Sequence, residues 1–301
     1  MKGRLMLLAT VLAAIAVTVA TTVVLLLVDP GAPRSEAIRT GALSGGAVVA
    51  LYALWLNDRR RRVEEARHDL EGEKVADERF ARSVELLGDE ADQVRVGALH
   101  SLAWLAGSTP RYKQTVLDVL CAYLRRPFEH PELSDHPDPA GAPPASDPEA
   151  DREREVRRTA QRLIADLLPW GEDPDERRYH LDLSGARLDF LRLEDRRIGR
   201  LTARRARFHG ATKLARLDAS KVVHLTDATF HGRLDLRGAR LAGGVSFQRT
   251  AFHGEVALEG TAVSTFLDIE TTAPAARKGT LRVGPETRIE GTVEGWGLAT
   301  P

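Results

Sequence analysis

The sequence contains a single cysteine, Cys121, and few aromatic side chains, which make up 5% of the residues. A lone thiol excludes an internal disulfide framework, and it excludes a zinc site or iron–sulfur cluster built on several cysteines of one chain. The 43 basic and 43 acidic residues leave no net charge that would attract nucleic acid or imitate it. The motifs GxSxG, HExxH and the P-loop are absent, so the sequence predicts no catalytic site.

Two uncharged segments near the start of the chain are long enough to cross a membrane as helices. Residues 5–28 carry no charged side chain, and about 20 such residues in a helix span a hydrocarbon core of about 30 Å. Residues 40–57 form a second, shorter uncharged segment with Tyr52 and Trp55 near its end, where amphipathic rings favour the membrane interface. We expect a transmembrane helical hairpin over residues 1–58. A cleaved signal peptide is the alternative for the first segment. The apolar region of a signal peptide spans only about 7–15 residues, however, which is shorter than residues 5–28.

Small residues in both segments favour close packing of the two helices. Gly41 and Gly45 lie four positions apart, a spacing that lets two helix backbones approach closely in lipid. The first segment offers four alanines as partners: Ala9, Ala13, Ala16 and Ala20. We predict that the two glycines form the packing surface of the hairpin; the alternative is that lipid simply tolerates them.

Basic residues at the outer ends of both segments predict the orientation of the hairpin. Lys2 and Arg4 precede the first segment, and four arginines, Arg59–Arg62, follow the second. Because basic residues near the end of a span favour the cytoplasmic side, both termini are expected in the cytoplasm, in a multi-pass protein of the inner (plasma) membrane. The four arginines also offer a contact with anionic headgroups, although their role in setting the topology is sufficient to explain them.

The region after the hairpin is predicted to be a cytoplasmic helical segment over residues 59–126. Good helix formers dominate it, and apolar residues recur at helical spacing. Val94, Ala98 and Leu102 resemble the second half of a HEAT-type helical repeat. Cys121 lies among leucines in this region, which predicts a buried, unreactive thiol.

A linker and one more helix are predicted to follow. Residues 127–150 are rich in proline and acidic residues and contain neither lysine nor arginine, which is typical of a flexible or extended linker. Residues 151–169 have apolar side chains along one helical stripe, so they predict an amphipathic helix.

From residue 180 onward the helical pattern gives way to a short repeat. Leucine or phenylalanine recurs every five or six residues, as at Phe230, Leu236 and Leu241. Self-similarity of this kind indicates an architecture in which successive units stack on one another.

The repeat resembles the pentapeptide-repeat family, whose unit has the form A(D/N)LxG. Residues 181–186 (LDLSGA) and 234–239 (LDLRGA) match that unit closely. The layout of a membrane hairpin, a helical segment and repeats also resembles membrane-anchored pentapeptide-repeat proteins of the high-GC bacterial type. The resemblance covers about residues 180–273, and it implies a right-handed quadrilateral β-helix with four faces in each turn.

The spacing predicts which residues stack between turns. Four faces of five or six residues make a turn of about 20–22 residues, and stacked turns bury a continuous ladder of apolar side chains. Two such ladders are expected, one of Phe208, Phe230 and Phe252 and one of Leu214, Leu236 and Leu258. Residues 274–301 are expected to form a C-terminal cap or tail, because an open solenoid end exposes unpaired backbone.

The same register gives two candidate interaction surfaces. His209, His231 and His253 fall in one column that follows a core position, so we expect them to face solvent; the alternative is that three aligned imidazoles bind a metal or titrate together. A cluster of arginines is expected to form a basic patch for anionic lipid, nucleic acid or an acidic partner, with a solvated face as the alternative. Its members are Arg196, Arg197, Arg200, Arg204, Arg205 and Arg207.

These features favour a non-enzymatic, membrane-anchored scaffold that displays a cytoplasmic β-helix for protein–protein interaction. We predict no catalytic residue, cofactor or metal. The expected partners are an unidentified cytoplasmic or membrane protein and the lipid bilayer, with no specific nucleic acid; a homo-oligomer is a further option.

The sequence leaves two alternative functions open. One is a membrane sensor or signalling component that reports inward from a short exterior loop, residues 29–39. The other, raised by the family resemblance, is DNA mimicry that protects a topoisomerase. That role needs a strongly acidic solenoid surface, which this sequence lacks.

Overall fold

The computed structural model describes residues 2–28, 34–133, 147–269, 280–284, 286–289 and 292–294. The chain divides into two compact units, Met1–Ala76 and Asp77–Pro301. Parts of three predicted segments lie outside the described residues: residues 29–33 of the exterior loop, residues 134–146 of the linker, and residues 270–279, 285, 290–291 and 295–301 at the end of the chain.

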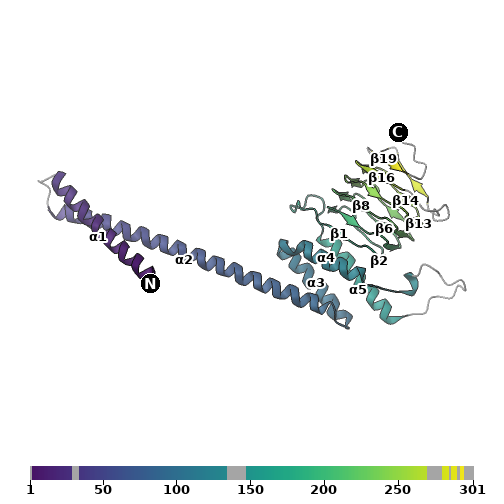
Figure 1. Ribbon diagram of the computed structural model, residues 1–301, viewed down its shortest axis with the longest axis horizontal. Helices are drawn as coiled ribbons and strands as arrows, with labels where there is room; N and C mark the ends of the chain where they lie inside the picture. Colours follow the sequence, from purple (N-terminus) through teal and green to yellow (C-terminus); the bar gives the residue numbers. More distant parts are fainter. Residues whose placement is uncertain are drawn as a thin grey trace. The chain divides into compact units, whose positions relative to one another are not determined.

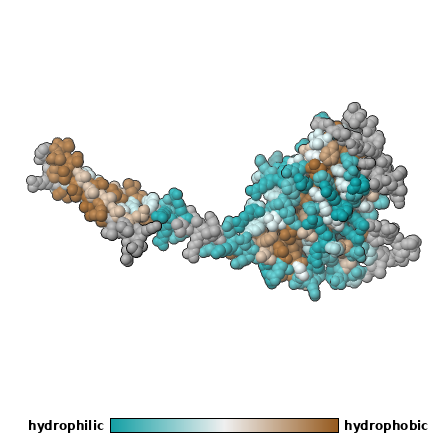
Figure 2. Space-filling view, in the orientation of Figure 1, coloured by the Kyte–Doolittle hydropathy of each residue, from teal (hydrophilic) through white to brown (hydrophobic). Residues whose placement is uncertain are grey.

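The first unit contains two helices that carry large apolar side chains on their outer surfaces. Helix α1 spans Lys2–Val28, and helix α2 spans Arg34–Leu86, so α2 continues into the second unit. The stretches Ala9–Val28 and Ile38–Arg62 are long and apolar enough to cross a membrane. Hydrophobic residues cover this part of the chain in Figure 2, which is the surface that lipid would cover if the helices span a bilayer.

Between the end of α2 and the solenoid, the described part of the chain forms three further α-helices and two short 3₁₀ turns (Figure 1). They are α3 (Asp92–Ser108), η1 (Pro110–Tyr112), α4 (Lys113–Arg125), η2 (Pro131–Leu133) and α5 (Pro148–Leu167). Helix α5 begins before the predicted residue 151, because the side chain of Asp147 accepts hydrogen bonds from the N–H groups of Glu149 and Ala150. Pro148 occupies the first helical position, where its missing N–H costs nothing.

Short strands of two or three residues form four parallel sheets in the described part of the solenoid. The first sheet has the order β1 (Leu181–Asp182), β4 (Leu201–Thr202), β8 (Val223–His224), β12 (Val245–Ser246), β16 (Phe266–Asp268) and β19 (Thr292–Glu294). The second contains β2 (Arg187–Asp189), β5 (Arg207–His209), β9 (Thr229–Phe230) and β13 (Ala251–Phe252). The third contains β6 (Thr212–Lys213), β10 (Leu234–Asp235), β14 (Val256–Ala257) and β17 (Leu281–Arg282). The fourth contains β3 (Arg197–Ile198), β7 (Asp218–Ala219), β11 (Arg240–Leu241), β15 (Ala262–Val263) and β18 (Arg288–Ile289).

Each strand pairs with the strand one full turn later, so the chain forms a parallel β-solenoid. Phe208 pairs with Phe230, and Phe230 with Phe252, which are 22 positions apart in both cases. The ring centroids of successive phenylalanines are 4.4 and 5.5 Å apart. This confirms the predicted phenylalanine ladder. The predicted leucine ladder is buried in the same register, and its members are Leu214, Leu236 and Leu258.

One hydrophobic core continues from the helices into the solenoid. Leu120 and Leu124 of α4 belong to the same buried cluster as Leu181 and Leu188 of the first turn. Helix α4 contacts β1 and β2, and Figure 1 shows it against that end of the solenoid. The helical segment therefore closes the end at which the solenoid begins, where an open turn would expose apolar side chains and unpaired backbone.

The first residues of the predicted linker are packed against α5. The guanidinium of Arg157 lies 4.8 Å from the ring centre of Phe128. His130 is 5% exposed, and its Nε2 lies 2.9 Å from Oδ1 of Asp151. Arg157 also donates hydrogen bonds to the carbonyl oxygens of Tyr123 and Leu124 at the end of α4, where a cation interacts favourably with the helix dipole.

Candidate interaction surfaces

Two of the six predicted arginines, Arg196 and Arg197, contact the segment that leads into the solenoid. Nη2 of Arg197 donates to the carbonyl oxygens of Asp173 and Asp175, at 2.6 and 3.3 Å. Nη2 of Arg196 lies 4.0 Å from the carboxylate of Asp166 near the end of α5. These contacts hold the entry to the solenoid together, and they draw both arginines away from the other four.

Arg205 lies at a corner of the solenoid, and Arg207 lies on the second sheet. Arg205 has a φ of 56°. A hydrogen bond from Arg249 lowers the pKa of the neighbouring Asp227, and the charge of Arg205 adds to this effect. Arg207 belongs to β5 and is half-buried. The six arginines spread in this way because the chain turns to a new face every five or six residues.

Arg200 and Arg204 remain as exposed cations on the outer side of the first sheet, beside β4. Lys221 is exposed nearby, before β8. Among the described residues, none of these three side chains has an ion-pair partner within 4.0 Å. We refer to Arg200, Arg204 and Lys221 as the basic face.

Two histidines on the first sheet experience the field of the basic face. Burial lowers the pKa of His224, and the positive charges of Arg204 and Arg200 lower it further. Burial, Lys221 and Arg200 lower the pKa of His180 in the same way. Both imidazoles are therefore neutral near pH 7, and the basic face is built from permanent cations rather than from titrating groups.

The predicted histidine column forms, and it begins with a carboxylate. Asp189 pairs in register with His209. The ring centroids of His209 and His231 are 4.4 Å apart, and those of His231 and His253 are 5.3 Å apart. His209 is only 6% exposed, so the expectation that the column faces solvent holds for His253 but not for His209.

Helix α5 explains why the start of this column is enclosed. Nε of Arg154 donates to Oδ2 of Asp189 at 2.7 Å, and Nη2 of Arg158 lies 2.6 Å from the same oxygen. These contacts place α5 against the first turn beside His209. No group of three or more His, Cys, Asp or Glu side chains in the described part of the chain is arranged to hold a metal ion.

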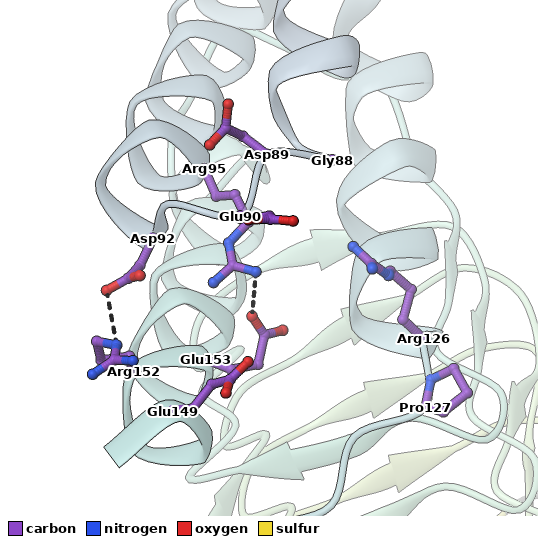
Figure 3. Close-up of a pocket in the computed structure, with 10 residues that line it drawn as sticks. All are labelled: Gly88, Asp89, Glu90, Asp92, Arg95, Arg126, Pro127, Glu149, Arg152 and Glu153. Carbon is purple, nitrogen blue, oxygen red and sulfur yellow. Dashed lines mark ion pairs between the residues drawn. The ribbon is translucent and has the colours of Figure 1, made fainter.

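A polar cavity of about 620 Å³ lies among the ends of α3, α4 and α5. Figure 3 shows that it is lined by charged side chains, several of which pair with one another. Arg95 lies 3.3 Å from Glu153, and Arg152 lies 3.6 Å from Asp92. We refer to α3, α4 and α5, which cover the start of the solenoid, as the helical cap. Because these ion pairs link α3 to α5, the side chains around the cavity form a charge network that stabilises the helical cap.

The two helices of the first unit approach closely at Gly41 and Gly45. A Cβ atom at Gly41 would collide with the hydroxyl of Thr22, and one at Gly45 would collide with the hydroxyl of Thr18. Ser44 donates a hydrogen bond across the hairpin to Oγ1 of Thr21 at 3.2 Å. The α1 surface that meets the glycines therefore contains threonines, whereas the four alanines expected as partners are exposed: Ala9, Ala13, Ala16 and Ala20.

Cys121 is buried in the core of the helical cap. Burial raises the pKa of its thiol to about 12. The thiolate is therefore scarce at physiological pH, and the reactivity of cysteine depends on that form.

Residues 220–262 match the family model for pentapeptide repeats, in nine copies. No curated protein matches the chain, and no solved structure matches it. Together with the four parallel sheets and the register of 22 residues, the match shows that the solenoid is built from pentapeptide repeats.

The structure also places together residues that the sequence did not single out. Gln161 of α5 and Phe190 of the first solenoid turn line one groove. In the sequence Gln161 is a polar residue within an amphipathic helix, and nothing in that pattern shows that it becomes buried. The unusual Phe190 was detectable in principle, because it interrupts a column in which the next turns carry Gly210, Gly232 and Gly254.

Proposed function

We propose that the protein is a non-enzymatic scaffold, anchored in the plasma membrane by α1 and α2, that binds a protein partner through its solenoid. The basic face is the observation that carries this proposal. In the described part of the chain these three exposed cations form no ion pair within 4.0 Å, so an acidic surface can pair with them, and such complementarity favours association with that partner. Interaction is also the usual role of solenoid folds, whose stacked repeats give extended binding surfaces.

The proposed membrane anchor agrees with the exposed apolar side chains of the first unit. With Arg59–Arg62 at the end of the second apolar stretch, both termini and the solenoid would lie in the cytoplasm. A tag fused after Pro301 is then expected to resist protease on intact cells and to be cleaved after permeabilisation. Cleavage on intact cells would place the solenoid outside and overturn the proposed topology.

Charge reversal tests the binding surface. The double variant Arg200→Glu, Arg204→Glu should lose proteins that crosslink to the wild-type chain in cells, because it repels an acidic partner. Arg240→Glu is the matched control, since Arg240 is an exposed arginine of the fourth sheet with no ion-pair partner among the described residues. Equal capture by the double variant and by the wild type would reject the basic face as the binding surface.

A DNA-mimicking role is disfavoured by the same observation. A mimic of the nucleic-acid backbone needs an array of carboxylates on its outer face, whereas Arg200, Arg204 and Lys221 are exposed cations beside β4 and β8. The membrane anchor and the basic face together favour a protein-binding role.

A further inference from the structure

A groove of about 700 Å³ lies between α5 and the first turn of the solenoid, within the range typical of ligand sites. It is separate from the basic face, because its side chains come from α5, from the residues around β2 and from the approach to β3. Gln161, Arg162 and Phe190 line it, together with several arginines and carboxylates.

Gln161 gives the groove an unsatisfied amide. The side chain is 6% exposed, and its Oε1 is buried without a hydrogen-bond partner. A buried amide that makes no hydrogen bond is costly. A primary amide offers N–H donors and a carbonyl acceptor, and rotation about its last torsion exchanges their positions. The group that best complements a donor and an acceptor together is another amide, as found in a peptide backbone.

Phe190 gives the groove an exposed aromatic ring in a disfavoured backbone conformation. Its φ is 52°, and its side chain is 54% exposed. The following turn carries Gly210 at the equivalent position, and the ring lies against that glycine. The guanidinium of Arg158 lies 5.9 Å from the ring centre. A positive φ recurs at other corners of the solenoid, as at Asp195 and Arg205, so Phe190 is distinguished by its exposed ring, which offers a contact for an apolar side chain.

The charges of the groove leave one cation unpaired. Arg192 pairs with Glu194 at 3.1 Å, and Arg196 is 4.0 Å from Asp166. The other two carboxylates that line the groove are also held, since Arg154 and Arg158 contact Asp189, and Nη2 of Arg216 donates to Asp195 at 2.7 Å. Arg162 is exposed, and it has no ion-pair partner in the described part of the chain. An incoming carboxylate therefore finds a free guanidinium beside Gln161.

We propose that this groove binds an extended, acidic peptide segment of a partner protein. The peptide backbone pairs with the amide of Gln161, an apolar side chain packs on Phe190, and a carboxylate pairs with Arg162. This inference rests on the proposed role of the solenoid in protein binding, and it names a second contact surface with its own chemistry.

The test uses the full chain in lipid nanodiscs. A phage-displayed library of random twelve-residue peptides is selected on it, and the enriched sequence is synthesised with a fluorescent label for polarisation measurements. We expect an enriched acidic peptide with an apolar residue. Its affinity should fall about tenfold with Gln161→Leu, which corresponds to the loss of about one buried hydrogen bond.

Two further variants separate the remaining contacts. Phe190→Gly should also weaken binding, and it suits the backbone because glycine occupies this position in the next turn. Arg162→Ala should weaken binding of the acidic peptide but not of its Asp→Asn or Glu→Gln version. Arg240→Ala, on the fourth sheet, should leave the affinity unchanged.

Any of four outcomes would overturn the proposal. The first is that no peptide is enriched over empty nanodiscs. The second is that the enriched peptide binds the Gln161→Leu and Phe190→Gly variants as tightly as the wild type. The third is that a fluorescent ATP analogue, rather than any peptide, binds the wild type and is lost in Gln161→Leu, which would assign the groove to a nucleotide. If groove variants capture the cellular partner normally while Arg200→Glu, Arg204→Glu does not, the groove proposal fails and the scaffold proposal stands.

Discussion

The hairpin and the solenoid bury opposite kinds of side chain. In the first unit, the helices meet through glycine and threonine, while Leu12 and Leu27 are 65% and 74% exposed. In the solenoid, Phe230 is 1% exposed, and glycines occupy the corners between sheets. The two regions differ in where their apolar side chains lie. In the solenoid, water drives apolar area into the core. In the first unit the apolar side chains are exposed, and the helices meet through close backbone contact, which is how helices associate in lipid.

The largest expected effect is the loss of a ring from the middle of the aromatic ladder. Phe230→Ala should lower the free energy of unfolding of the second unit by about 4 kcal/mol, because Phe230 stacks on both Phe208 and Phe252 and the cavity cannot close without shifting two turns. Urea denaturation followed by the fluorescence of Trp104 and Trp170 measures it. Phe190→Gly is the control with little expected change in stability; equal losses for both variants would show that the ladder is not the main source of stability.

The second largest loss of stability is expected from substitution of a glycine at a corner of the solenoid. A Cβ atom at Gly232 would collide with the backbone of Gly210, which cannot move without shifting the turn, so Gly232→Ala should cost about 3 kcal/mol. Gly97 of α3 is the matched control, since a Cβ there meets nothing within 4 Å. Gly97→Ala should stabilise the protein by up to about 1 kcal/mol through its higher helix propensity. The same denaturation experiment should therefore give changes of opposite sign, and two changes of the same sign would contradict the corner argument.

A smaller effect is expected from valine substitutions in α2 of the hairpin, and it should depend on whether the substituted glycine faces α1. Gly45→Val should weaken the contact between α1 and α2 by about 2 kcal/mol, because its side chain would strike Thr18. Gly46→Val changes the neighbouring residue, where a Cβ meets nothing within 4 Å. A disulfide-trapping assay between engineered cysteines in α1 and α2 would report the contact. Equal trapping in both variants would show that Gly45 is not needed for the contact between α1 and α2.

The sequence predicts the parts of this molecule that repeat or that follow one periodicity. The spacing of Phe208, Phe230 and Phe252 is enough to place the rings in one ladder, because the register of a solenoid is set by the length of its turn. The uncharged runs are likewise sufficient to predict two apolar helices.

The contacts between unlike elements could not be predicted in this way. An amphipathic helix shows that it has a buried face, but not that α4 covers the first solenoid turn. The arginines from Arg196 to Arg207 are close in sequence, yet the solenoid turns place them on different faces. The groove depends on Gln161 and Phe190, which are 29 positions apart and belong to elements with different periodicities.

The smallest expected effect concerns pH and the basic face. Burial, then Arg204 and Arg200, lower the pKa of His224 below its ordinary value of about 6.5. The unfolded chain therefore binds more protons than the folded one as the pH falls below about 6.5, and the contribution of His224 to stability decreases toward acid. NMR titration of the imidazole should give a higher pKa for His224 in Arg204→Ala than in the wild type. The pKa should remain below the ordinary value, because burial is the larger cause. Arg240→Ala should leave it unchanged, and an unchanged value in Arg204→Ala would mean that the basic face exerts no field on the first sheet.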